Sequence, residues 1–350
     1  ARQRSWTGFL VTLVVACAWL ATAFGAEQAG SSHDELVRLF AEWREFQKPK
    51  LVAGVPDYTA DAMAAQHREL ARYQQRLDAI NPSGWPVSQQ VDHQIVRAEM
   101  NGLDFDHRVL RPWARDPSYY VIVHTGQSDT PAHEGSAVYG AIELWTYEYP
   151  VRGERLIELK TKLRGAPALL EQAKRNLVGD ARDLWTAGIR SAAAQAAALQ
   201  SLADRLTTTQ PDLVDDVRRA HKAAGDFRTW LEARLPAKKG PSGIGIENYN
   251  WYLKHVHLLP HTWQDQLALV RRELARGHAS LRLEEERNRA LPQPAPVASA
   301  EEYTRRFNDA VTTYMAFLRD RQVLTIQPWM DPALRARIGS FAPGDRPREF

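Results

Sequence analysis

The chain has 350 residues, of which 44% are hydrophobic and 25% are charged, and its formal net charge is +3. This composition is that of an ordinary folded protein and excludes a chain dominated by disorder. Basic residues are mixed with acidic ones along the sequence, so no positive stripe is present that would follow a phosphate backbone. We therefore expect no nucleic-acid partner.

The first 26 residues differ from the rest of the chain. Arg2 and Arg4 precede an apolar run from Gly8 to Ala26, and a polar sequence follows. This order is typical of an export signal, and Ala21-Thr22-Ala23 fits the small-residue pattern that a signal peptidase cleaves. The apolar run also approaches the length that spans a bilayer, so a retained membrane segment is an alternative.

Residues 1–26 therefore predict an exported protein, either periplasmic or secreted, with any membrane contact made through this segment alone. Cys17 is the only cysteine of the chain and follows Val14-Val15-Ala16, so lipidation at Cys17 is a further alternative. Without this segment the chain has no cysteine and can form no disulfide.

From residue 33 onward the hydrophobic pattern is helical, and we expect an all-α domain over residues 33–342, built as a bundle of antiparallel amphipathic helices. Between Asp61 and Ile80, apolar side chains recur at steps of three and four residues, which places them on one helical face. A second helix, capped by Ser88, is expected to pair with the first. Its expected inward residues are Val91, Ile95, Val96, Met100 and Leu103.

Residues 112–150 interrupt the helical pattern. Proline, glycine and aspartate recur in this stretch, and Tyr119-Tyr120-Val121-Ile122-Val123 favours a short extended segment. We expect an irregular loop insertion that packs on the bundle.

Helical periodicity returns after the insertion. Helices are expected over residues 155–163, 167–177, 180–206 and 212–235. A longer helix is expected from the N-cap Thr262 to Arg289, with four apolar residues facing inward, namely Leu267, Val270, Leu274 and Leu281.

The last predicted helix begins after a proline-rich linker at residues 292–296. Ser299 is followed three residues later by Glu302, which is the spacing of a capping box. Residues 343–350 are polar and are expected to be a disordered, truncated tail.

The stretch from Gly240 to Trp263 is the most distinctive part of the sequence. Its glycines allow the backbone to turn or to approach a ligand closely, and the aromatic residues that follow offer flat amphipathic surfaces. We expect this stretch to contact substrate as one wall of a pocket. The predicted substrate-binding residues are Ser242, Gly243, Gly245, Tyr249, Trp251 and Tyr252.

His255 and His257 follow these aromatic residues. In an extended segment two such side chains point to one side and could share a metal ion, whereas on a helix they diverge by about 200°. No carboxylate stands at a spacing typical of zinc enzymes, so we predict no metal site in this chain. No nucleophile is paired with a base, and the catalytic residues stay unknown.

The distinctive stretch, continued to Pro292, resembles the central part of a bacterial family known as domain of unknown function 885. Further segments carry the resemblance, which spans most of the chain after residue 33. They are Asp116-Pro117-Ser118-Tyr119-Tyr120, Gln127-Ser128-Asp129-Thr130-Pro131-Ala132-His133, Asn176-Leu177, Asp183-Leu184-Trp185, Leu283-Glu284-Glu285 and Asn288-Arg289.

The family is similar to helical zinc metallopeptidases, and many members carry a His-Glu motif with a second histidine in their C-terminal half. Here the pair His133-Glu134 has no second histidine at the spacing of a zinc helix. The resemblance therefore implies that zinc belongs to the full-length protein and that this chain, which ends at Phe350, is an N-terminal fragment without the metal motif.

Two functions remain open from the sequence. The first is a peptidase-like, zinc-dependent hydrolase, to which this chain contributes a cleft wall for a peptide-like substrate. The second is a periplasmic binding or scaffold protein that holds a peptide or glycan and breaks no bond. The sequence does not determine the oligomeric state.

Overall fold

The computed structural model describes residues 32–126, 140–292 and 295–341, and these residues fold as helices joined by loops and two very small sheets. The predicted all-α class is therefore confirmed. The predicted export signal, the segment 127–133 that carries part of the resemblance and the predicted tail at 343–350 lie outside the described residues. Two compact units are present, residues 1–269 and residues 270–350.

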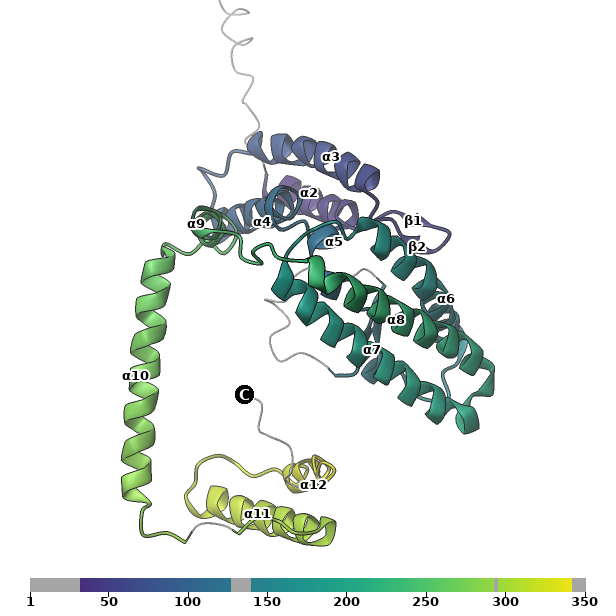
Figure 1. The fold of residues 1–350 in the computed structure, drawn as a ribbon. Helices are drawn as coiled ribbons and strands as arrows, with labels where there is room; N and C mark the ends of the chain where they lie inside the picture. The colour runs from purple at the N-terminus through teal and green to yellow at the C-terminus, as the bar shows by residue number, and fades with distance from the viewer. Residues whose placement is uncertain (1–31, 127–139, 293–294, 342–350) are drawn as a thin grey trace, which may run out of the picture. The chain divides into compact units, whose positions relative to one another are not determined.

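Helices make up most of the first unit (Figure 1). They are α2 (His33–Phe46), α3 (Ala60–Asp78), α4 (Val87–Phe105), α5 (Pro112–Arg115), α6 (Gly153–Asn176), α7 (Arg182–Thr209), α8 (Val214–Arg234) and α9 (Ile246–His255). Helix α10 (Trp263–Arg287) begins in this unit and continues into the second.

The first three helices enclose one hydrophobic core. Ser32 and Thr59 accept hydrogen bonds from the first turns of α2 and α3, so both helices begin at side-chain caps. Tightly buried side chains then fill the space between α2, α3 and α4. They are Leu36, Leu39, Trp43, Leu70, Leu77, Ile80, Val96 and Met100.

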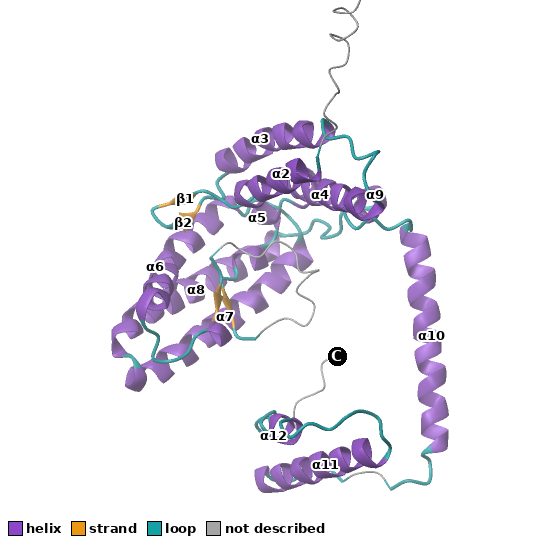
Figure 2. Ribbon diagram, turned by 180° about the vertical axis from the view of Figure 1, so that it is seen from behind, coloured by secondary structure: helices purple, strands orange, loops and turns teal. Residues whose placement is uncertain are grey.

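Helices α6, α7 and α8 enclose a second and larger core. They lie side by side in both views, with α8 in contact with the other two (Figures 1 and 2). Large apolar side chains are fully buried between them. They include Leu159, Leu163, Trp185, Leu206, Val217, Phe227 and Leu231.

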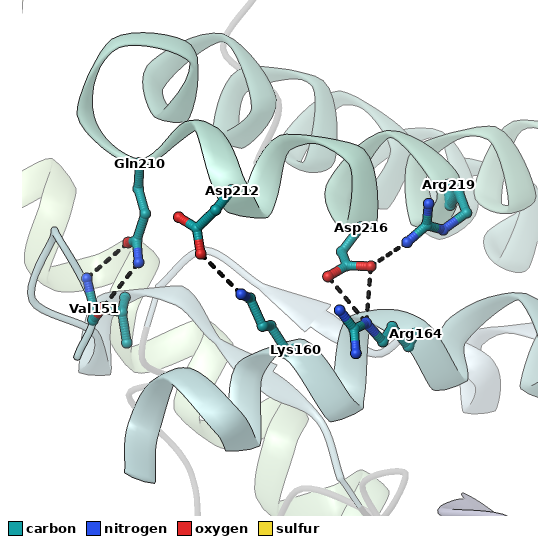
Figure 3. Close-up of polar contacts among 7 residues, drawn as sticks. All are labelled: Val151, Lys160, Arg164, Gln210, Asp212, Asp216 and Arg219. Carbon is teal, nitrogen blue, oxygen red and sulfur yellow. Dashed lines mark hydrogen bonds and ion pairs between the residues drawn. The ribbon is translucent and has the colours of Figure 1, made fainter. Parts of the chain in front are cut away.

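Polar contacts also join α6 and the residues before it to α8 and to the turn that precedes α8 (Figure 3). The Gln210 amide both donates to and accepts from the Val151 backbone, at 2.8 Å in each direction. Lys160 pairs with Asp212 at 2.8 Å. Because Gln210 is buried, its two backbone bonds satisfy groups that would otherwise lose their water partners.

The predicted loop insertion at residues 112–150 is confirmed for its described residues. It contains α5, a 3-10 helix at Pro117–Tyr120, and the strands β3 (Val123–His124) and β4 (Ile142–Glu143), which pair in parallel. Tyr120 and Ile142 are fully buried, so the insertion packs against the bundle. The expected extended segment at residues 119–123 is confirmed only in its later part, since Val121 is extended and Val123 belongs to β3, whereas Tyr119 and Tyr120 belong to the 3-10 helix.

Some predicted helix details are wrong. Residues 155–163 and 167–177 form one continuous helix, α6, because Pro167 is accommodated within it. Helix α4 begins at Val87, so Ser88 lies inside the helix and does not cap it. Val96 and Met100 are buried as predicted, but Val91 and Ile95 are 49% and 46% exposed, and the packed face of α4 carries His93 as well.

Helix α10 begins where predicted, because the Thr262 hydroxyl accepts from the Asp265 backbone. No residue of α10 is buried. Val270, Leu274 and Leu281 are 61%, 59% and 58% exposed, so the prediction that they face inward is wrong. The amphipathic pattern indicated a helix correctly, but within the second unit no described element covers this face.

The second unit contains α11 (Ala300–Asp320) and α12 (Met330–Arg335). The predicted N-cap is confirmed, since Ser299 accepts from the Glu302 backbone, and the Glu302 side chain accepts from the backbone of Ala298, one residue before the N-cap. A small core between the two helices contains Val311, Met315, Leu318 and Met330. Among the described helices of the whole chain, none has both the length and the apolar character needed to cross a bilayer.

Candidate functional site

The loop that begins at Gly240 is attached to the start of α7 through its backbone. The Gly240 N–H donates to the Asp180 carbonyl at 2.8 Å, and the Arg182 N–H donates to the Gly240 carbonyl at 3.2 Å. A Cβ atom at Gly240 would lie 2.8 Å from that Asp180 oxygen, which is closer than real side chains come. Glycine is therefore required here by a contact within the protein.

Ser242 also has a structural partner. Its hydroxyl oxygen accepts from the backbone N–H groups of Asp183, at 2.9 Å, and Leu184, at 3.4 Å. Helix α7 has no capping side chain of its own, since Ala181 stands at its N-cap position. Ser242 thus caps α7 from a distant part of the chain.

The two predicted glycines differ in their surroundings. Gly243 has open space around the position of a Cβ atom. Gly245 has φ of +85° and ψ of 160°, a conformation that essentially only glycine adopts, and α9 begins directly after it. Gly245 sets the direction in which α9 leaves the loop.

The aromatic residues of α9 pack on the end of α4. Trp251 stacks on Phe105 with ring centroids 5.5 Å apart and planes 6° from parallel, and Tyr252 lies 4.9 Å from the same ring. Burial, with the Asp106 charge nearby, raises the pKa of the Tyr252 phenol. Tyr249 is different, because 39% of it is exposed. Of the three predicted aromatic residues, Tyr249 offers the most accessible ring.

A series of polar contacts extends from Trp251 into the bundle. The Arg108 guanidinium lies over the Trp251 ring, 5.1 Å from its centroid. Arg108 Nε donates to Asp104 Oδ2 at 2.6 Å, and the other oxygen of Asp104 lies 3.0 Å from His67 Nε2. One carboxylate on α4 therefore joins the aromatic residues of α9 to a histidine on α3.

His67 stacks on a second histidine. The His67 and His107 rings have centroids 4.8 Å apart and planes 9° from parallel. His107 is buried, packs against Trp113, and its Nε2 lies 3.1 Å from Gln66 Oε1. Burial, reinforced by the neighbouring His67, lowers the pKa of His107 from 6.5 to about 4, so this imidazole is neutral at pH 7.

The backbone is irregular where α4 ends, beside His107. After α4 the chain continues as a π-helix at Asp106–Leu110, and Arg111 then adopts a left-handed conformation with φ of 44°. Arg115 donates to the carbonyls of Val109 and Leu110 and to the carbonyl of Ser242. Single turns of π-helix occur often at functional sites, and here Arg115 ties this one to the 240–245 loop.

His67, beside the end of α4, is held by the Asp104 carboxylate. When His67 Nε2–H donates to Asp104, its Nδ1 is left as a hydrogen-bond acceptor. The His67 side chain is 39% exposed, so a ligand can reach this imidazole. We name the set of Asp104, His67, His107, Arg108 and Trp251 the corner cluster.

The corner cluster was not predicted as a site. The sequence analysis singled out Trp251 but did not connect His67 with Asp104. The available signal was the expected pairing of the two helices, together with the Asp104 and Arg108 spacing of four residues, which brings the two onto one face.

His255 and His257 do not form a pair. His255 ends α9 and packs on Trp251, with ring centroids 4.9 Å apart, while His257 packs edge-on against Tyr252. Within the described ranges, no group of three histidine, cysteine, aspartate or glutamate side chains could hold a metal ion. In the corner cluster the Asp104 oxygens are engaged by Arg108 and His67, so its donor atoms do not fit zinc.

The comparisons with known proteins establish no family. No family model matches the sequence, and no curated protein matches it. Among solved structures, the chain is similar to a candidate lipoprotein of unknown function from Shewanella oneidensis, at 13% sequence identity and a TM-score of 0.51. The match covers 86% of this chain and 59% of that one. At this identity the likeness concerns the fold alone.

Proposed function

We propose that this protein is exported and forms one wall of the ligand-binding cleft of a peptidase-like hydrolase, binding a peptide-like ligand without supplying the metal motif. The resemblance to domain of unknown function 885 implies zinc for such a hydrolase. The described side chains do not fit zinc, so they bind and orient the ligand and no step passes through a metal that they hold.

One observation carries this proposal. The contacts from Trp251 through Arg108 and Asp104 to His67 join the predicted wall to a polar group that is accessible to solvent. Pockets for organic ligands combine aromatic surface with a few fixed polar groups. The corner cluster has both, and its imidazole acceptor suits a peptide N–H.

Two further features support the proposal. The 240–245 loop is held by Ser242 and Arg115, which lowers the entropy that the wall loses when a ligand binds. The structural relative from Shewanella oneidensis is a candidate lipoprotein, and this agrees with an envelope location and with the alternative of lipidation at Cys17.

A binding or scaffold protein for a peptide or glycan is the second candidate. The exposed ring of Tyr249 favours it, because a tyrosine side chain has only two χ angles and can stack on a sugar or an apolar side chain at small entropic cost. This function needs the same wall and differs only in whether a bond is broken elsewhere in the cleft.

The test is a binding screen with an arrayed panel of short peptides and oligosaccharides, using the wild type, Tyr249→Ala and His67→Ala. Tyr314→Ala is the control, because Tyr314 is also an exposed tyrosine but lies on α11. We expect a peptide ligand whose affinity falls at least about fivefold in the first two variants and stays unchanged in the control. Selective glycan binding favours the second candidate. Equal binding by all four proteins contradicts the proposal that Tyr249 and His67 contact the ligand.

A further inference from the structure

A separate hollow lies between the β1–β2 hairpin and helix α6, away from the corner cluster. Its volume is about 480 Å³, within the range of small-molecule sites. Strands β1 (Leu51–Val52) and β2 (Val55–Pro56) pair antiparallel and form one side, and a face of α6 forms the other. The lining contains the two arginines Arg164 and Arg175 and no acidic side chain.

Small residues produce this hollow. The hairpin lies close to α6 at Gly165, where a Cβ atom would be in ordinary contact with the Val55 side chain at 3.5 Å, and the missing side chain leaves space beside it. Ala168 follows on the same side of the helix and fills little space. Across from them, Val52 is 62% exposed and borders the hollow with Ala53. One side of the hollow is therefore apolar and uncovered.

Arg164 is held in place by a buried acid. Its Nε lies 3.0 and 3.1 Å from the two oxygens of Asp216, whose exposure is 2% (Figure 3). Arg219, on α8, pairs with Asp216 as well. Within the described part of the chain, the terminal Nη1 and Nη2 of Arg164 have no hydrogen-bond partner. Asp216 therefore orients the guanidinium through Nε, and the N–H groups of Nη1 and Nη2 are available for a ligand.

The charges at the hollow do not cancel. Asp216 carries one negative charge against the two positive charges of Arg164 and Arg219. Arg175 lies three turns farther along α6, about 16 Å away along the axis and on nearly the same face. It adds positive charge, and no ion pair within the described residues neutralises it. An anion is attracted to such a site, and a guanidinium binds a carboxylate through paired N–H groups.

We propose that this hollow binds a small organic carboxylate, with the carboxylate on the terminal nitrogens of Arg164 and the apolar body against Val52 and Ala53. Arg175 contributes through its field, by attracting the anion, and makes the smaller contribution to affinity. This site is independent of the proposed cleft wall, and either can fail without the other.

The experiment measures binding by isothermal titration calorimetry at low ionic strength, with hexanoate and hexanamide as probes. The two have the same apolar chain and differ in charge. We expect hexanoate to bind at least about tenfold more tightly than hexanamide, and more tightly than inorganic phosphate, which has no apolar body. Equal affinity for hexanoate and hexanamide, or tighter binding of phosphate, overturns the proposal.

Variants test the position of the site. Arg164→Gln should weaken the binding of hexanoate about tenfold. Arg175→Gln should weaken it about two- to threefold at low ionic strength and not at high salt. Arg219→Gln is the matched control, because Arg219 shares Asp216 but does not line the hollow. Equal losses in Arg164→Gln and Arg219→Gln contradict a contact with Arg164.

A filling variant protects the test against misfolding. Circular dichroism checks each protein, and Ala168→Leu fills the hollow while every charge is kept. Hexanoate binding should be lost in a folded Ala168→Leu protein. If this variant binds hexanoate as the wild type does, the ligand lies elsewhere and the proposal is wrong.

Discussion

His67 and His107 stack face to face, 4.8 Å apart between ring centroids, with one partly exposed and bound to Asp104 and the other buried and bound to Gln66. Two imidazoles at this distance cannot both be charged without repulsion in a desolvated site. The pair therefore keeps one neutral ring in the core and one ring that a ligand can reach.

The neutral state of His107 predicts a dependence of stability on pH. Its pKa is 6.5 in an exposed chain and about 4 in the fold, so between these values the unfolded chain binds the proton more readily. The free energy of unfolding therefore carries no penalty from His107 above about pH 6.5, and it falls as the pH drops from 6.5 toward 4. In His107→Gln, the loss of unfolding free energy between pH 7 and pH 5 should be about 2 kcal/mol smaller than in the wild type.

Urea unfolding at both pH values measures this difference. His278→Gln is the control, because His278 is exposed on α10. An identical pH dependence in the wild type and His107→Gln would show that His107 titrates as a solvated histidine.

The contact between Arg108 and Asp104 should stabilise the fold more than an ordinary surface pair. Asp104 is only 20% exposed and binds two partners, whereas the Arg72–Glu69 pair is well exposed. Arg108→Ala should lower the free energy of unfolding by about 1–2 kcal/mol, and Arg72→Ala by less than about 0.5 kcal/mol. Thermal unfolding of the two variants side by side decides the matter, and equal effects contradict the bridging role of Asp104.

Two glycines of one loop should respond differently to alanine. A Cβ atom at Gly240 meets the Asp180 carbonyl at 2.8 Å, while the same atom at Gly243 has open space. Gly240→Ala should destabilise the protein by about 1–3 kcal/mol, and Gly243→Ala should have little effect. Denaturant unfolding measures both, and a neutral Gly240→Ala is the contrary result.

The remote cap of α7 gives a further prediction. Ser242 supplies the oxygen that accepts from the first turn of the helix. Ser242→Ala should cost about 1 kcal/mol of unfolding free energy, and Ser242→Thr should restore most of it. Hydrogen exchange at the Asp183 amide provides a local measurement, where faster exchange is expected in the alanine variant only.

The helical class and most helix positions follow from the sequence because apolar spacing and caps are local. Thr262 and the Ser299–Glu302 box show this, since each acts on its own helix. The direction in which a face points is not local. Val270 and Leu274 have the correct helical spacing and stay exposed, because burial depends on a packing partner that spacing does not specify.

The candidate site shows the same division. The sequence singled out the 240–252 stretch, yet Ser242, Trp251 and Tyr252 are used for capping and packing within the protein. His67 and Asp104 lie 37 residues apart, and only the pairing of α3 with α4 brings them together. The sequence predicted that the two helices pair, but it did not specify the register that places His67 against Asp104.

Recovery of bound ligand is the most direct measurement of the central claim that these residues bind a ligand without cleaving it. The purified protein is incubated with the peptide pool, with and without zinc and with and without a chelator, and mass spectrometry identifies what is bound and what is released. We expect intact peptides bound in every condition, and fewer of them on Tyr249→Ala. Peptide cleavage that the chelator abolishes would contradict the account.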